Sequence, residues 1–227
     1  MIGTPQRSMR RTPANFDRHA GIYRTLELIA FGRDLERARF RFLDRLCECR
    51  SILVLGEGDG RALARLRQAA PLARIHCIDA SAAMLARCAA RLPDRSRVVL
   101  EQADLLDVSL PPGDYDAVVT FFVLDCFRPE QVDMIVAAVR RSLRPGALWL
   151  FADFVMPVGR LARWRAAAWL GILYAFFRWQ TGLHATHLPE SEEILRRHGF
   201  APMAACDFQR GLIRSAVFVR AGPARCR

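Results

Sequence analysis

A glycine turn follows directly on an apolar run near the end of the first quarter of the chain. The sequence reads Ile-Leu-Val-Leu over residues 52–55 and Gly-Glu-Gly-Asp-Gly over residues 56–60. The apolar run predicts a buried strand, and the residues after Gly60 have the pattern of a helix. Because glycine has no side chain, a ligand can lie directly on the backbone of the turn. We therefore expect strand, turn and helix to form a cradle for a nucleotide-type cofactor.

The net charge of +11 at pH 7 is carried by arginine alone, because the 34 basic residues include no lysine. This excludes a P-loop lysine, a Schiff-base lysine and the Tyr-Lys pair of some dehydrogenases. A basic balance favours an anionic partner, but arginines spread along the whole chain are also typical of a solvated surface. The 7 cysteines include no Cys-x-x-Cys pair. They predict reduced thiols in a cytoplasmic protein, with no disulfide framework and no metal site.

Apolar runs and helical patterns alternate from residue 51 onward. Short strands that are apolar throughout are typical of a parallel sheet buried on both faces. We predict an α/β fold, a Rossmann-like and mostly parallel seven-stranded sheet with helices on both faces and an antiparallel C-terminal hairpin. The expected strands cover residues 51–55, 74–78, 97–101, 116–122, 147–154, 201–207 and 212–220. The expected helices between them cover residues 61–70, 82–92, 130–142 and 190–198.

Two segments flank or interrupt this alternation within one expected domain, residues 14–222. Residues 1–13 form a polar leader that we expect to be disordered, and they show no signal-peptide pattern. Residues 14–49 have helical periodicity and predict an N-terminal helical cap, or gate, in which Gly32 separates two helices.

Residues 157–190 form a hydrophobic, aromatic-rich insertion that we expect to act as a lid. Its apolar core, residues 166–177, is shorter than the ~20 residues of a membrane-spanning helix. Residues 164–179 carry Trp and Arg at both ends, which also fits peripheral contact with the inner membrane surface. A helix buried in the core or in a dimer interface is the alternative.

The spacing of the glycines indicates which cofactor the turn holds. A dinucleotide site has the pattern Gly-x-Gly-x-x-Gly, but here the third glycine comes one position early and is followed by Arg61. Glu57 and Asp59 make the turn acidic, which favours a cofactor that is cationic and free of phosphate. The second predicted strand ends at Asp79, 19 residues beyond Gly60. A carboxylate there can accept hydrogen bonds from both ribose hydroxyls, whereas its alternative role is to cap the next helix.

A further carboxylate follows the third predicted strand, where Asp104 precedes Leu105. Asp104 can accept a hydrogen bond from an adenine amino group while Leu105 packs on the ring. Taken alone, Asp104 is equally typical of a surface loop.

Together these motifs resemble those of the class I S-adenosylmethionine-dependent methyltransferases. The resemblance covers residues 15–220 and lies in the order of the pieces. The glycine loop is followed by Asp79, by Asp104, by Tyr-Asp-Ala-Val-Val at 115–119 and by Leu-Arg-Pro-Gly at 143–146. Within that superfamily the chain is most similar to the ubiquinone/menaquinone C-methyltransferase branch. The similarity lies in Asn-Phe-Asp-Arg-His-Ala-Gly-Ile-Tyr at 15–23 and in Leu-Pro-Glu-Ser at 188–191, followed by Leu195 and Gly199-Phe200.

The resemblance implies that S-adenosylmethionine is the cofactor and assigns a part of it to each motif. It implies that Tyr23 closes over the cofactor and that the methionine part is held by the loop residues Gly56, Gly58 and Asp59, with Gly60 completing the loop. It further implies that Asp79 binds the ribose and that Asp104 and Leu105 bind the adenine. Phe121 would line the exit of strand four. One position departs from the family pattern, because Val54 stands where an acidic residue is usual. The cofactor's ammonium group then needs another partner, such as Glu57 or a backbone carbonyl.

Methyl transfer from a sulfonium is an in-line displacement, so the protein mainly supplies alignment and a site with little water. A phenolic or enolisable carbon acceptor also needs a base. Asp125 is our candidate, because it follows the C-terminal end of strand four, where open α/β sheets place their active sites. Its alternative role is to cap the next turn. His184 and His187 of the insertion are the other candidates.

The aromatic insertion predicts a small hydrophobic acceptor, aromatic or lipid-like. Two other functions stay open. A nucleic-acid methyltransferase is suggested by the charge, but the chain lacks the Asp/Asn-Pro-Pro-aromatic motif after strand four and has no basic stretch interleaved with aromatics. A non-catalytic cofactor-binding or assembly module is suggested by Val54.

Overall fold

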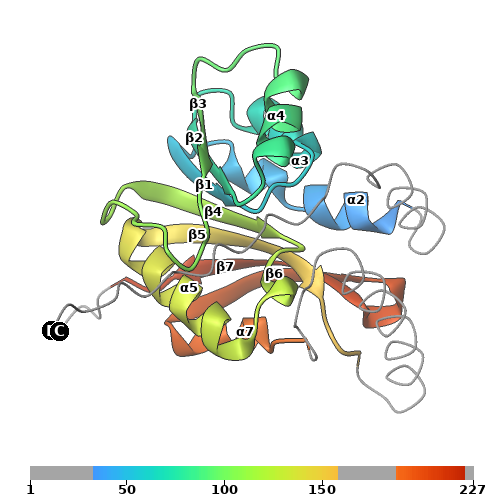
Figure 1. The fold of residues 1–227 in the computed structure, drawn as a ribbon. Helices are drawn as coiled ribbons and strands as arrows, with labels where there is room; N and C mark the ends of the chain where they lie inside the picture. Colours follow the sequence, from blue (N-terminus) through green and yellow to red (C-terminus); the bar gives the residue numbers. More distant parts are fainter. Residues whose placement is uncertain (1–32, 158–187, 223–227) are drawn as a thin grey trace, which may run out of the picture.

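A seven-stranded sheet forms the centre of the molecule (Figure 1). The computed structural model describes residues 33–157 and 188–222. The strands lie in the order β3-β2-β1-β4-β5-β7-β6. Their bounds are β1 Ser51–Leu55, β2 Arg74–Asp79, β3 Val98–Gln102, β4 Tyr115–Phe121, β5 Leu143–Phe154, β6 Phe200–Phe208 and β7 Ile213–Arg220.

The five N-terminal strands are parallel, and β7 pairs antiparallel with both β5 and β6. The predicted fold class and its C-terminal hairpin are therefore confirmed. Strand β1 lies between β2 and β4, so the strand order reverses beside it. In open α/β sheets a ligand binds at such a reversal, beyond the carboxyl ends of the strands.

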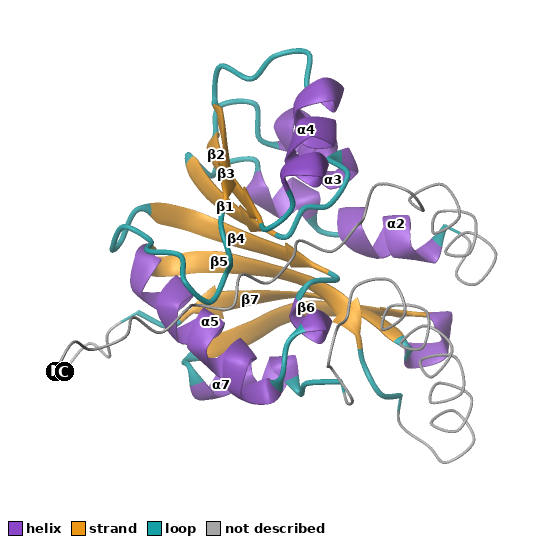
Figure 2. Ribbon diagram, viewed as in Figure 1, coloured by secondary structure: helices purple, strands orange, loops and turns teal. Residues whose placement is uncertain are grey.

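Helices cover both faces of the sheet (Figure 2). The helices α2 (Asp34–Phe40), α3 (Arg61–Ala69) and α4 (Ala82–Arg91) contribute Leu35, Leu63 and Cys88 to one buried cluster. On the other face, α5 (Pro129–Ser142) and α7 (Ser191–Arg197) contribute Ile135 and Leu195 to a second cluster. Each helix thus buries one apolar stripe against the sheet, as the periodicity of the sequence predicts.

The centre of the sheet is buried on both sides. All five residues of β1 are buried, and so are most of those in β4. Trp149 of β5 is fully buried, packs edge-on against Phe200 with ring centroids 5.1 Å apart, and donates a 2.8 Å hydrogen bond from its indole N–H to Thr120 Oγ1. That bond satisfies the one polar group of the indole in the core.

The helix predicted after Gly32 is shorter than the sequence pattern indicates. Helix α2 ends at Phe40, and a 3-10 helix, η1, follows at Leu43–Leu46. The backbone leaves the helical region at Phe42, with φ of −128°, and the side chains of Phe42 and Leu43 are buried in the same cluster as α3. The apolar positions therefore fit a helix pattern although the chain turns there to fill the core.

Other expectations lie outside the described residues. They concern residues 14–32 of the N-terminal cap, residues 158–187 of the insertion, and the side chains Tyr23, His184 and His187. Within the parts of the chain that are described, no helix has both the length and the apolar character needed to cross a membrane.

Candidate functional site

The loop between β1 and α3 has three glycines in the left-handed region, with φ of 63° at Gly56, 71° at Gly58 and 86° at Gly60. A Cβ atom at Gly56 would lie 2.3 Å from the Val123 side chain, and one at Gly60 would lie 2.7 Å from the Cα of Cys88. Packing therefore requires glycine at both positions. A Cβ at Gly58 would meet no atom within 4 Å. The backbone at Gly58 is open to a ligand, as the cradle requires.

Asp79, the last residue of β2, joins this loop to α4. Its Oδ2 accepts a 3.1 Å hydrogen bond from the Gly58 N–H, and its Oδ1 accepts a 2.9 Å bond from the Ser81 N–H. Burial raises the pKa of Asp79, and these two N–H groups oppose the rise. Each carboxylate oxygen has a second lone pair, so Asp79 can hold the loop and still accept from ligand hydroxyls.

The two acidic residues of the loop are engaged by the protein. Glu57 Oε1 accepts a 2.8 Å hydrogen bond from the Leu63 N–H and so caps the first turn of α3. Burial raises the pKa of Glu57 to about 7. Asp59 Oδ2 lies 2.8 Å from Arg61 Nε and 3.2 Å from Arg91 Nη2. The loop is therefore not a patch of uncompensated negative charge, although its sequence suggests one.

The remaining residues predicted to contact a cofactor follow β3 and β4. Asp104 is exposed and accepts a 3.0 Å hydrogen bond from the Leu106 N–H, which closes a turn. Leu105 is buried in the cluster that also contains Ile78 and Leu55. Phe121 is buried at the end of β4. Asp104 and Leu105 follow the carboxyl end of β3, and Phe121 is the last residue of β4, so all three lie at the same edge of the sheet as Asp79.

Asp125 lies in the 3-10 helix η2 (Leu124–Cys126) and is buried beside a second acid that sequence reasoning missed. The Asp125 N–H donates a 3.2 Å hydrogen bond to Oδ2 of Asp153, which is 2% exposed near the end of β5. Burial raises the pKa of both carboxyl groups, and the charge of Asp125 raises that of Asp153 further. One proton is therefore retained by the pair above the usual carboxyl range.

Arg39 of α2 is a second residue that sequence reasoning missed. Its Cζ lies 5.0 Å from the ring centroid of Phe122, the residue after β4, and the Phe122 ring packs on Phe154 at 5.3 Å. The positive charge of Arg39 also lowers the pKa of Glu57, so its guanidinium lies near the glycine loop. No acidic side chain of the described residues forms an ion pair with Arg39. Arg39 lies in an arginine-rich segment, Arg37 to Arg41, and the sequence of this segment does not indicate which of its arginines faces the candidate site.

No three His, Cys, Asp or Glu side chains of the described ranges, 33–157 and 188–222, are grouped to hold a metal ion. The candidate site residues are thus an open glycine loop, the carboxylate of Asp79 bonded to it, a buried acid pair at the ends of β4 and β5, and the half-buried Arg39.

Part of the chain is similar in sequence to known methyltransferases. A family model described as a methyltransferase domain matches residues 52–146. The tRNA N(3)-cytidine methyltransferase METTL6 of Rattus norvegicus is 36% identical over 72 residues, which cover 32% of this chain and 25% of that protein. The Homo sapiens METTL6 is 32% identical over 72 residues, with the same coverage. The match thus spans about a quarter of the length of these relatives.

Solved structures share the fold over most of the chain. An O-methyltransferase family protein from Burkholderia thailandensis aligns with a TM-score of 0.69 at 15% identity, over 89% of this chain and 60% of that one. N-methyltransferase NodS from Bradyrhizobium japonicum WM9, in complex with S-adenosyl-L-homocysteine, aligns with a TM-score of 0.63 at 18% identity, over 90% and 98%. Residues 52–146 thus match the model of a methyltransferase domain, and the chain shares the fold of solved methyltransferases over most of its length.

Proposed function

We propose that the protein transfers a methyl group from S-adenosylmethionine to a small hydrophobic acceptor. The observation that carries this proposal is the glycine loop at the carboxyl edge of the sheet, open at Gly58 and tied to the carboxylate of Asp79. When bound, the cofactor supplies an activated methyl group on a sulfonium. The chain supplies the backbone of the loop for the methionine part, Asp79 for the ribose, and Asp104 with Leu105 for the adenine.

We propose Arg39 as the partner of the cofactor's carboxylate. A half-buried guanidinium without an ion-pair partner among the described residues is suited to an anionic group, and Arg39 lies near Glu57 and Phe122 at the same edge of the sheet. Glu57, whose pKa is about 7, can then serve the neighbouring ammonium group in its ionised form. Glu57 would then replace the acidic partner of the ammonium group that is usual at the position of Val54.

The acid pair is our candidate for proton removal. Burial raises the pKa of both Asp125 and Asp153, and the charge of Asp125 raises that of Asp153 further, so the pair is suited to take up a proton from a phenol or an enolisable carbon. The aromatic pair Phe122–Phe154 lies beside them in sequence, at the ends of β4 and β5. It supports an apolar acceptor. A quinone-precursor-like acceptor follows from the resemblance to the ubiquinone/menaquinone branch.

The test begins with binding of S-adenosylhomocysteine, measured by isothermal titration calorimetry. We expect the wild type to bind and Asp79→Ala to lose at least tenfold in affinity, because the carboxylate holds both loop and ribose. Asp94→Ala, which changes an aspartate in the loop between α4 and β3, is the matched control and should bind as the wild type does. Unchanged affinity of Asp79→Ala would contradict the proposed site.

The same measurement tests Arg39. Arg39→Ala should weaken cofactor binding several-fold, whereas Arg37→Ala, on the same helix and paired with Asp34 at 3.2 Å, should leave it unchanged. Equal affinities of the two variants would remove Arg39 from the site.

Turnover is then measured on a panel of phenolic, quinone-like and lipid-extract acceptors. Methylation that rises with pH above the usual carboxyl range, and that Asp125→Asn reduces at least tenfold, supports the acid pair as base. Cofactor binding without turnover on any acceptor would favour the non-catalytic module. Negative liposome flotation together with inactive lipid extracts would contradict a lipid-like acceptor.

A tRNA-type acceptor is the second candidate. Two observations favour it, the similarity to tRNA N(3)-cytidine methyltransferases over 72 residues and the net charge of +11. Filter binding of transfer RNA with a salt titration decides the question, because phosphate contacts give affinity that falls steeply with salt. Methylation of RNA and not of small molecules would replace our first proposal.

A further inference from the structure

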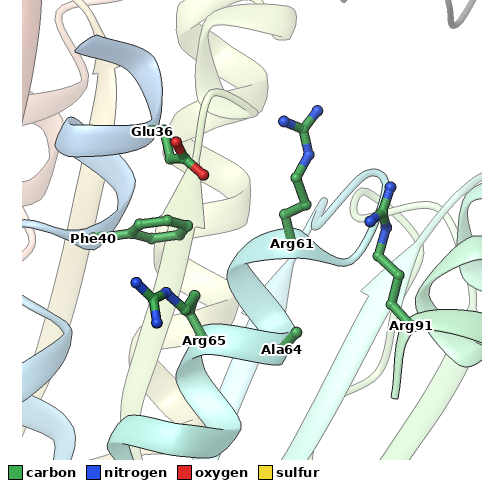
Figure 3. Close-up of a pocket in the computed structure, with 6 residues that line it drawn as sticks. All are labelled: Glu36, Phe40, Arg61, Ala64, Arg65 and Arg91. Carbon is green, nitrogen blue, oxygen red and sulfur yellow. The ribbon is translucent and has the colours of Figure 1, made fainter. Parts of the chain in front are cut away.

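A pocket of about 280 Å³ lies between α2 and the outer side of α3 (Figure 3). It is lined by Glu36, Phe40, Arg61, Ala64, Arg65 and Arg91. The α3 residues in it lie on the helix face opposite the buried side chains Ala62, Leu63 and Leu66. None of the six lining residues is among those assigned to the cofactor above, although Arg61 and Arg91 contact Asp59 of the neighbouring glycine loop.

Two of its arginines are held in place by the glycine loop. Asp59 Oδ2 lies 2.8 Å from Arg61 Nε and 3.2 Å from Arg91 Nη2, and the Asp59 carbonyl accepts a 2.7 Å hydrogen bond from Arg91 Nε. Figure 3 shows both guanidinium groups extending from their helices toward the same side of the pocket. Side chains fixed in this way lose little conformational freedom when they bind a ligand.

The third arginine and the aromatic ring form the opposite wall. Arg65 Cζ lies 5.6 Å from the ring centroid of Phe40, and Arg65 Nη1 donates a 3.1 Å hydrogen bond to Gln68. The ring of Phe40 packs on the core and gives the pocket an apolar surface beside the charges. Three guanidinium groups face two carboxylates, those of Glu36 and Asp59, so one positive charge is in excess.

We propose that this pocket binds a small phosphomonoester. A phosphate group has three terminal oxygens, and planar guanidinium groups bind such oxygens with paired N–H donors. Arg61 and Arg91 would take the phosphate, Arg65 would add a third donor group, and Phe40 would contact the carbon part. The volume lies just below the usual range for drug-sized ligands, about 300–1,000 Å³, and so suits a ligand of this size.

The experiment uses the full chain in chloride buffer at constant ionic strength, with inorganic phosphate and glycerol phosphate as probes in isothermal titration calorimetry. We expect the wild type to bind both, and glycerol phosphate more tightly. Arg61→Gln with Arg91→Gln should lose at least tenfold in affinity. Arg65→Gln should lose several-fold, and it leaves the contacts to Asp59 intact. The control is Arg141→Gln, an exposed arginine of α5 on the other face of the sheet, which should bind as the wild type does.

Three results would overturn the proposal. The first is that the wild type gives no heat of binding with either probe, and the second is that the pocket variants bind both probes as well as Arg141→Gln does. In a third case a single-stranded RNA oligonucleotide binds through these arginines while neither small phosphate does, and the pocket is then part of a nucleic-acid surface. Binding of S-adenosylhomocysteine, measured on the same samples, separates failure here from failure of the methyl-transfer proposal.

Discussion

At the scale of single residues, the glycine loop is specified by what packs against it. Gly60 has φ of 86°, and a Cβ there would lie 2.7 Å from the backbone of Cys88. Gly146 has a similar φ of 79° but open space around it. An alanine at Gly146 therefore meets backbone strain alone, whereas an alanine at Gly60 meets both backbone strain and steric overlap with Cys88.

We predict that Gly60→Ala lowers the free energy of unfolding by about 3 kcal/mol and Gly146→Ala by about 1 kcal/mol. Both variants force alanine into the left-handed region, and only the first also forces α4 away from the loop. Chemical denaturation monitored by circular dichroism measures the difference. Equal losses would mean that α4 does not pack on the loop as described.

Glu57 predicts a pH dependence of stability. Its pKa is about 7 in the folded protein and 4.5 in its ordinary state. Between these values the unfolded chain releases the proton while the folded protein keeps it, so the contribution of Glu57 to stability is most favourable below about pH 4.5 and is lost as the pH rises through 7. Glu57→Gln keeps the acceptor for the Leu63 N–H and removes the titration.

The expected result is that the variant gains on the order of 3 kcal/mol over the wild type between pH 4.5 and pH 8. Denaturant titrations at both pH values measure this. Glu130→Gln, at an exposed position in the first turn of α5, is the control and should follow the wild type. A difference between Glu57→Gln and wild type that does not vary with pH would contradict a buried carboxyl at this position.

The sequence alone predicts those candidate site residues whose positions depend only on nearby turns and strand ends. The glycines and Asp79 could be predicted because strand ends and turn spacing fix them along the chain. Asp153 could not, since its relation to Asp125 depends on the pairing of β4 with β5, and the acids lie 28 positions apart. A lone aspartate inside the apolar run of residues 147–154 was the available signal. The neutralisation of Asp59 by Arg91 depends in the same way on how α4 packs.

At the scale of elements, α4 depends on its first turn. The Ser81 hydroxyl accepts a 3.3 Å hydrogen bond from the Met84 N–H, while the Ser81 N–H donates to Asp79. We predict that Ser81→Ala costs about 1 kcal/mol of stability, because a free N–H is left at the helix start.

The same variant should weaken S-adenosylhomocysteine binding by less than threefold, since its N–H still orders Asp79. Ser81→Asp, which retains a capping acceptor, should recover most of the stability. A Ser81→Ala protein as stable as the wild type would show that this cap contributes nothing.

The predicted and observed bounds of a strand agree where a single sequence pattern marks both of its ends. Strands β1, β2 and β3 lie within one residue of their predicted bounds, since apolar runs ended by polar residues mark a buried parallel strand. Strand β5 begins at Leu143 and not at residue 147, because Leu143 pairs with Tyr115 before the register shifts and Arg144-Pro145-Gly146 is carried within the strand. Turn signals in the sequence cannot distinguish such an irregular strand from a loop.

At the scale of the whole molecule, the mostly parallel sheet could be predicted because strands alternate with helices along the chain, whereas the strand order comes from the structure. Parallel neighbours need crossover helices, and right-handed crossovers place them on both faces. The terminal hairpin follows from the short connection at Gln209–Gly211. The division of the core into two clusters, one on each face, follows from the same topology.

Strand β6, one of the two edge strands of the sheet, carries a proline at position 202 and a register shift between Pro202 and Ala204, and it exposes Met203. Proline has no N–H to offer, and a bulge twists the strand away from a flat edge. A strand from a neighbouring molecule therefore cannot form a complete set of inter-strand hydrogen bonds with β6. Concentrated solutions of Pro202→Val should scatter more light and seed thioflavin-positive aggregates sooner than wild type, with Pro112→Val, in the turn before β4, behaving normally. We therefore expect the irregular edge at β6 to oppose the addition of strands from other molecules.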